Sequence, residues 1–263
     1  MRSTPSVRNL AASFWTSKMV TTVDRLTISA SSRPVLTSLC AATVLGIAWT
    51  VNDFFAWKAF GTGGTPPTWY GYLRMSKFRF GHLLAGPDLL DPSPHATTGP
   101  SYLDAPFPAR AGGRARIMPR IMPQRQVPEP IDHETRTRLL GLVHRLANEF
   151  PDLLESKPSH TEGRSTDGLY VLAEVPTLNA EAREDKLLAR EVAHAHPADN
   201  SLHVWLSGPD ARKVMEAGWG QRFPLPFVRS GWTMVYAPRN DNEMDVVERI
   251  VKAGIAWVAG VEL

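Results

Sequence analysis

The feature that most constrains this chain is an uncharged apolar run from Val35 to Val51. In a helix, seventeen residues span roughly 26 Å, slightly less than the hydrocarbon core of about 30 Å. Continuing the helix to Phe55 brings it to full length. Thr, Ser and Gly residues weaken the apolar character of the run, yet the sequence predicts one transmembrane helix over residues 35–55.

The segment before this run, residues 1–34, is rich in Ser, Thr and Arg and contains a single acid, Asp24. We interpret it as a disordered basic flank of a signal anchor. A mitochondrial transit peptide has the same composition and stays open as an alternative. The expected localisation is therefore a single-pass membrane protein of the endoplasmic reticulum or another endomembrane, with the mitochondrion as the alternative.

Two further segments follow the anchor. Residues 56–85 interleave aromatic and basic side chains, a composition that favours the lipid interface, so membrane lipid is an expected partner. Residues 86–130 contain ten prolines. Proline at this density is incompatible with the interior of helices and sheets, and the pattern predicts a Pro-rich linker.

The charge is unevenly distributed along the chain. Residues 1–130 hold 14 Lys and Arg against 6 Asp and Glu, whereas residues 131–263 hold 15 against 20. An acidic second half argues against a nucleic-acid partner, which requires a basic face. The single cysteine, Cys40, excludes an intrachain disulfide and a thiolate metal cluster.

Residues 131–263 have the pattern of a folded α+β domain. Asp132, Asn179, Ser207 and Asn240 each precede a helical pattern as an N-cap residue. The helix after Asn179 is expected to continue to Val192. Short apolar runs predict strands over residues 169–175, 202–206 and 232–236. The strands and helices alternate without a regular βαβ rhythm, so a mixed fold rather than a parallel sheet is expected.

The densest polar cluster in this domain contains Glu191, His194, His196 and His203. In extended backbone, His194 and His196 point to the same side, and His203 lies on the polar face of the next expected strand. Three interpretations remain open for this group. It could be a three-histidine metal site for zinc or iron, an acid–base pair in which Glu191 or Asp199 orients one histidine, or a set of structural hydrogen bonds.

A second cluster extends from Gly218 to Leu225, where two glycines allow a tight turn that presents the indole of Trp219. Arg222 has the chemistry to bind a carboxylate or an enolate. Trp219 could equally fill the core beneath the turn. A third cluster lies at a strand-to-helix junction near residue 239. The residues predicted to bind substrate are Trp219, Gln221, Arg222, Phe223, Tyr236 and Arg239.

These clusters, in this order, resemble the fungal luciferases and the wider luciferase-domain family. The matching residues are Arg190, Glu191, Ala193, His194, His196, His203, Gly218-Trp-Gly-Gln-Arg222, Pro224, Leu225, Trp232, Thr233, Tyr236-Ala-Pro-Arg-Asn240, Glu243 and Val246-Val-Glu248. The resemblance covers most of the chain, is specific over residues 190–251, and includes an anchor in the same place.

The resemblance implies an oxidoreductase that acts on a small hydroxylated pyrone, 3-hydroxyhispidin in the luminous branch, with molecular oxygen as co-substrate. Enolate formation, oxygen addition and loss of carbon dioxide would follow, with no cofactor and no metal. His194, His196 or His203 would be the base, assisted by Glu191. Arg222 or Arg239 would be the anion partner.

One residue departs from the family pattern. The luciferases have histidine after Gly-Trp-Gly-Gln-Arg, whereas this chain has Phe223. Loss of a titratable group from this motif predicts a non-luminous member of the family. Two alternatives stay open: a non-catalytic, membrane-tethered module that binds a small molecule, and an enzyme that depends on a histidine-bound metal.

Overall fold

A computed structural model describes residues 33–120 and 122–263. These residues fall into two compact units that divide after Ala56. The expected disordered N-terminus lies outside the described residues, apart from its last two positions.

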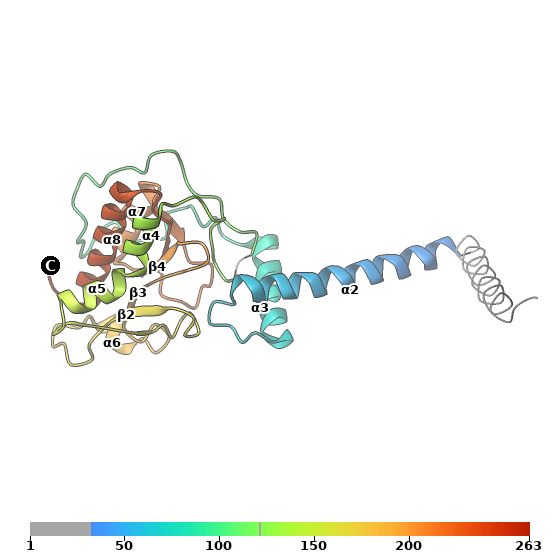
Figure 1. The fold of residues 1–263 in the computed structure, drawn as a ribbon, viewed down its shortest axis with the longest axis horizontal. Coiled ribbons are helices and arrows are strands. Elements are labelled where there is room, and N and C mark those ends of the chain that lie inside the picture. Colours follow the sequence, from blue (N-terminus) through green and yellow to red (C-terminus); the bar gives the residue numbers. More distant parts are fainter. Residues whose placement is uncertain (1–32, 121) are drawn as a thin grey trace, which may run out of the picture. The chain divides into compact units, whose positions relative to one another are not determined.

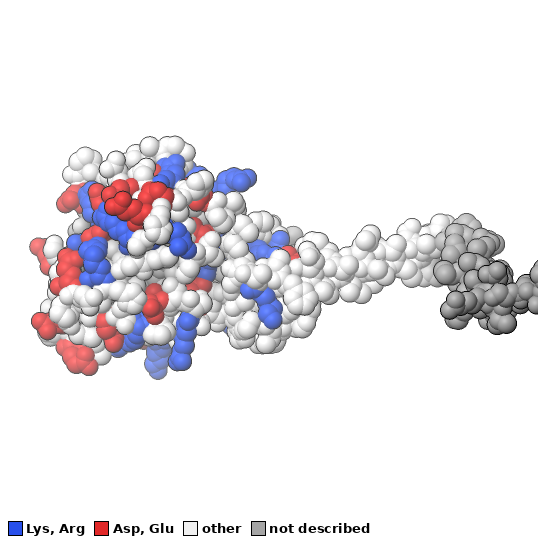
Figure 2. All heavy atoms as spheres, viewed as in Figure 1, with Lys and Arg blue, Asp and Glu red and all other residues white. Residues whose placement is uncertain are grey.

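Helix α2, Pro34–Phe60, contains the apolar run. It is the one helix of the described residues that is long and apolar enough to cross a membrane, although a signal sequence has the same properties. Between Val35 and Val51 its large apolar side chains are exposed, and the helix surface in Figure 2 carries almost no charge. Exposed hydrocarbon of this extent is unfavourable in water.

The second unit begins at Trp57 and includes helix α3, Trp69–Ala85, which Thr68 caps by accepting a hydrogen bond from the Gly71 N–H. The indole of Trp57 is buried beside Tyr72. Other large side chains of α3 remain exposed, among them Tyr70 and Leu84. The aromatic segment predicted as interfacial is therefore helical over much of its length and divides its aromatic side chains between core and surface.

The centre of the second unit is a six-stranded antiparallel sheet in the order β1-β2-β3-β4-β6-β5 (Figure 1). Its strands are β1 Leu154–Pro158, β2 Asp167–Val171, β3 Glu191–Ala195, β4 Leu202–Trp205, β5 Gly220–Arg222 and β6 Trp232–Val235. A register shift lies between Leu169 and Tyr170, where β2 pairs with β3. The two central strands, β3 and β4, are buried along their whole length.

The other helices of this unit are α4 His133–Leu140, α5 Leu142–Glu149, α6 Ala180–Glu184, α7 Gly208–Glu216 and α8 Asp241–Ala259. Of these, α5, α7 and α8 pack against strands of the sheet, and α4 packs against α8. Helix α8 packs across β3 and β4. The approach is close at Gly254, where an added Cβ would meet the Trp205 carbonyl oxygen at 2.9 Å. The buried apolar face of α8 forms the centre of the core with the sheet.

The predicted α+β class is confirmed, and so are all four predicted N-caps. The helix after Asn179 is shorter than predicted. It ends at Glu184, and Val192 lies in strand β3. The Asp185 carboxylate accepts hydrogen bonds from the backbone N–H groups of Leu187 and Leu188 instead. Ala189 and Arg190 then adopt positive φ angles that redirect the chain into the strand.

Residues 86–130 are irregular, as their proline content predicts, but they belong to the second compact unit. Leu103, Arg110 and the run from Gln124 to Gln126 are buried against it. Side chains of the domain bind this backbone: the Asp210 carboxylate accepts the N–H groups of residues 102 and 103. The segment predicted as a linker therefore forms part of the domain wall.

Candidate functional site

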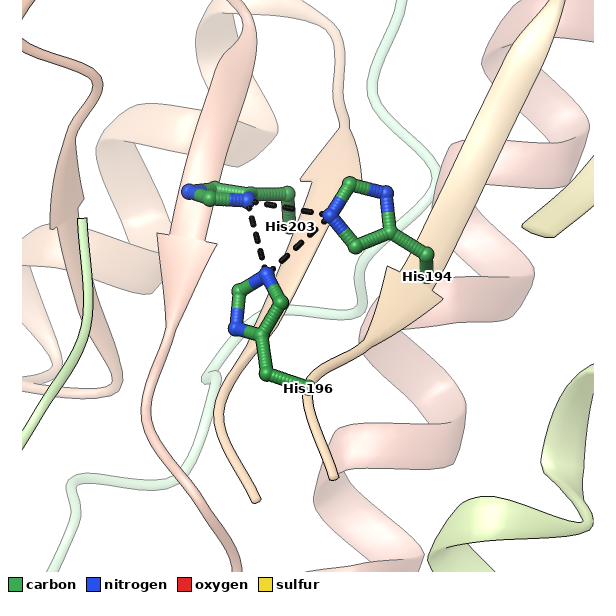
Figure 3. A group of neighbouring side chains, drawn as sticks. All are labelled: His194, His196 and His203. Atoms are coloured by element: carbon green, nitrogen blue, oxygen red, sulfur yellow. Dashed lines mark hydrogen bonds between the residues drawn. The ribbon is translucent and has the colours of Figure 1, made fainter. Parts of the chain in front are cut away.

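The three histidines meet on the face of the sheet opposite α8. His194 and His203 are directly paired on β3 and β4, and the His196 N–H donates to the Ser201 carbonyl oxygen just beyond β3. The Nε2 atom of His194 is 3.1 Å from Nε2 of His196. The Nδ1 atom of His203 is 3.1 Å from His196 Nε2 and 3.3 Å from His194 Nε2. One nitrogen of each ring thus points to a common centre (Figure 3).

The outer nitrogens of His194 and His196 face acceptors. Nδ1 of His194 lies 2.7 Å from the Glu191 carboxylate. Nδ1 of His196 lies 2.9 Å from the Ser201 hydroxyl oxygen, and that hydroxyl donates its own proton to Asp199. Because the Ser201 proton is already used, its oxygen accepts from His196. Both imidazoles therefore have their outer nitrogen protonated and can present a bare Nε2 to the centre.

The third outer nitrogen faces the side chain of Gln124. Nε2 of His203 lies 3.2 Å from Gln124 Oε1, and Gln124 Nε2 donates to the Arg222 carbonyl oxygen at 2.9 Å. This second bond orients the amide, so the oxygen of Gln124 faces the imidazole. His203 therefore donates from Nε2, and its inner atom is Nδ1.

Three buried carboxylates surround the histidines, together with one guanidinium. Glu191 accepts hydrogen bonds from Ser159 and Tyr170 as well as from His194. Glu162 pairs with Arg125, and one of its oxygens lies 3.5 Å from the inner nitrogen of His194. The carboxylate of Asp199 lies 3.8 Å from the Arg125 guanidinium. With the imidazoles neutral and the carboxylates ionised, this cluster carries a formal charge of −2.

Burial and charge act in opposite directions on the histidines. Burial lowers the pKa values of His196 and His203 well below the ordinary value, helped by the positive charge of Arg125. Burial also lowers the pKa of His194, but the carboxylates of Glu162 and Glu191 outweigh it and raise that pKa to about 9. The protein thus favours one positive charge at the centre of the three rings.

An apolar hollow of about 270 Å³ adjoins the cluster. Two of its lining side chains pack against His203. The Phe223 ring meets the imidazole edge-on, with the ring centroids 5.1 Å apart, and the Trp232 ring stacks on it, with the centroids 5.6 Å apart. Arg74 is another of its lining residues. A larger, polar hollow of about 420 Å³ is lined by other residues, including Tyr102 and Arg249. Neither hollow is lined directly by the three histidines.

The predicted substrate-binding residues lie in two places. Phe223 lines the hollow, and the Arg222 carbonyl binds Gln124, while the Arg222 guanidinium donates to the Asp88 carbonyl oxygen. The other four gather around the buried Arg110. Its guanidinium lies over the rings of Trp219 and Tyr236, Gln221 accepts from the Tyr236 hydroxyl, and Arg239 shares Glu243 with Arg110.

Sequence reasoning identified Glu191 and the three histidines, and named Asp199 as a partner, but missed four residues around them: Gln124, Arg125, Glu162 and Trp232. The first three come from irregular segments, where no periodicity marks a buried side chain. Adjacent polar residues in a proline-rich stretch, Gln124-Arg125-Gln126, were the available signal. The face predicted to be open is covered by these segments and by the two aromatic rings, so the histidines are buried.

Comparison with known proteins places the three histidines, Glu191 and Asp199 inside a matched region. A model of the luciferase domain matches residues 189–254. A luciferase from Neonothopanus nambi is 34% identical over 166 residues, covering 59% of this chain and 61% of that protein. A luciferase from Armillaria mellea is 31% identical over 168 residues, covering 52% and 61%. One from Armillaria gallica is 44% identical over 75 residues, covering 26% and 28%. No solved structure matches the chain.

Proposed function

Because this chain is a member of the fungal luciferase-domain family, we propose that it oxidises a small, enolisable hydroxylated aromatic molecule, such as a pyrone, with molecular oxygen. The alignments with the Neonothopanus nambi and Armillaria mellea luciferases each cover 61% of the length of those proteins. The activity proposed here is therefore that of the family's domain, applied to this chain.

One observation carries the proposal. The family-matching segment, residues 189–254, supplies the three histidines and also two walls of the adjoining hollow, Phe223 and Trp232. A cluster of histidines with shifted pKa values beside an apolar hollow lined by aromatic rings is the arrangement expected of a small-molecule active site. The flat walls suit a conjugated ring, and Arg74 offers a positive charge to an enolate oxygen.

The chemistry requires little from the protein. Removal of a proton from the hydroxylated ring leaves an electron-rich enolate, whose carbon can donate an electron pair to oxygen and form a carbon–oxygen bond. Cleavage of the peroxide with loss of carbon dioxide retains every atom, since substrate and oxygen together equal product and carbon dioxide. No external reductant is needed. The apolar walls of the hollow would reduce the contact of the enolate with water, and the histidine cluster, whose His203 contacts Phe223 and Trp232, is where the proton would be held.

Helix α2 fits this function as an anchor. We propose that it holds the chain in an endomembrane, so that the domain collects an apolar substrate that partitions into the same membrane. The proposal rests on the length and exposed apolar surface of α2. A helix removed as a signal sequence would instead leave a domain without an anchor.

The deciding experiment uses membranes that contain the full chain. Pyrones, beginning with 3-hydroxyhispidin, are added while oxygen uptake, photons and product mass are recorded. We expect uptake of one oxygen and release of one carbon dioxide per substrate, with uptake abolished in His203→Asn and retained in the exposed-residue control His144→Gln. Binding of the pyrone without oxygen uptake would contradict the proposal and support a binding module.

A further inference from the structure

We propose that the inner nitrogens of His194, His196 and His203 bind a divalent first-row transition-metal ion, with Glu162 beside it as an additional oxygen donor. The family resemblance implied no metal, whereas the spacing of the histidines in the sequence left a three-histidine metal site open. The donor set of three neutral imidazoles and a carboxylate suits iron(II), zinc or cobalt. The proposal does not depend on the oxidation proposed above, and where the ion is bound its three histidine ligands do not hold the substrate's proton.

The first argument is the spacing of the inner nitrogens. Three nitrogens that bind one zinc ion tetrahedrally at about 2.0–2.1 Å lie roughly 3.3–3.4 Å apart. The three distances in this protein are 3.1, 3.1 and 3.3 Å. Histidines that merely hydrogen-bond in pairs have no reason to place a third nitrogen at the same distance from both.

The second argument is the direction of the lone pairs. The outer nitrogen of each ring donates its proton to Glu191, Ser201 or Gln124, respectively. Each inner nitrogen is then an acceptor that faces two other acceptors. A shared proton can bridge only one pair of these nitrogens at a time, whereas a metal ion at the centre attracts all three. Metal-binding histidines in known sites are oriented by an acceptor at the outer nitrogen, such as a carboxylate, and each of these three rings has an oxygen acceptor there.

The third argument is charge. The surrounding carboxylates of Glu162, Glu191 and Asp199 are buried, and Arg125 is the buried cation that pairs with two of them. The resulting formal charge of −2 is neutralised by one divalent ion. The oxygen of Glu162 that faces the rings lies 3.5 Å from His194 Nε2 and 3.9 Å from His196 Nε2, on the approach to their common centre. A buried cluster with this excess charge would otherwise be costly.

The test measures metal content rather than activity. The full chain, carrying no polyhistidine tag, is purified in detergent and exposed in turn to iron(II) without oxygen, zinc and cobalt(II), then desalted and analysed for metal. We expect about one ion per chain in the wild type and in His144→Gln, whose exposed imidazole lies outside the cluster. His196→Asn should lose the ion. Glu191→Gln, which changes only an outer partner, should weaken binding by about 10- to 100-fold.

Two further measurements keep the outcome decisive if His196→Asn does not fold. Wild-type chain loaded with cobalt should show visible absorption bands of a histidine-bound ion, and its melting temperature should rise on loading. If the wild type binds none of the three ions, the cluster holds a proton instead and the proposal is overturned. Equal binding by wild type and folded His196→Asn would overturn it as well.

Discussion

His194 and His203 face each other in register across strands β3 and β4, and the Nε2 atom of His194 lies 3.3 Å from Nδ1 of His203. When the outer nitrogens carry their protons, a hydrogen bond between these two inner atoms requires a second proton on one ring, and His194 is the histidine whose pKa is raised, to about 9. The pair therefore needs a shared cation, and the stability of the domain should depend on one.

Metal removal is the first prediction. We expect a chelator to lower the melting temperature of the wild-type chain, because an ion at 100 times its Kd stabilises the folded state by about 2.7 kcal/mol. For a domain of this size each kcal/mol corresponds to roughly 2–4 °C. Thermal melts with chelator, and again after metal is restored, measure the change. The melting temperature of folded His196→Asn should be the same with and without chelator, and a wild type that behaves likewise would contradict the prediction.

Phe223 is the subject of the second prediction. Its ring lines the hollow and meets His203 edge-on, so Phe223→His would place a titratable group beside the histidine centre. With 3-hydroxyhispidin we expect the wild type to emit no light above background and Phe223→His to emit measurably more. Phe223→Leu, which keeps the wall apolar, is the matched control. Bright emission from the unmodified chain would show that a histidine at this position is dispensable.

The third prediction concerns the anchor. The large apolar side chains of α2 between Val35 and Val51 are exposed, and burial in lipid stabilises them by about 25 cal/mol per Å². The full chain should stay in the membrane pellet after alkaline carbonate extraction. A chain of residues 57–263 keeps α3 and should be released by the same treatment. Recovery of the full chain in the supernatant would show that α2 does not span the bilayer.

The buried ion pair of Arg125 and Glu162 gives a fourth prediction. Arg125→Gln leaves the carboxylates of Glu162 and Asp199 without their cation and should lower the free energy of unfolding by about 3–5 kcal/mol. Adding Glu162→Gln should recover part of this loss, and urea denaturation of the single and double variants measures the coupling. Arg212→Gln, in a more exposed pair, should cost under about 1 kcal/mol. Equal losses in the Arg125 and Arg212 variants would contradict the prediction.

The fifth prediction is a pH dependence away from the histidines. Burial raises the pKa of Glu243, but Arg239 and Arg110 outweigh it and hold that pKa below its ordinary value. A lowered folded-state pKa contributes stability above the unfolded value, about 4.3, that is lost as the pH falls through the folded value. The stability difference between wild type and Glu243→Gln should therefore be largest near pH 7 and shrink towards pH 3.5. The exposed control Glu174→Gln should show a smaller change, measured by urea denaturation at each pH.

Local sequence patterns were sufficient for several parts of the structure. The uncharged run determined a long apolar helix, and Ser207 and Asn240 marked helix starts because an N-cap depends on residues within one turn. The alternation of side chains in extended backbone was enough to predict that His194 and His196 share a side. The prediction that the helix after Asn179 continues to Val192 failed, because Asp185 and the positive φ angles of Ala189 and Arg190 end it earlier.

Only the tertiary structure decided what surrounds the histidines. Gln124, Arg125 and Glu162 reach the site from irregular segments. Gln124 and His203 are 79 residues apart in the sequence, and no local sequence pattern links residues at such a separation. For Trp219 and Tyr236, local sequence suggested a role that the tertiary contacts do not place beside the histidines. Trp219 lies in a glycine-bounded turn and Tyr236 at a strand end, which suggested substrate binding, and both rings pack against Arg110. Residue type and spacing define which groups a chain can offer; the long-range packing of loops against the sheet determines which of them share one buried centre, because burial and charge neutralisation are properties of the whole fold.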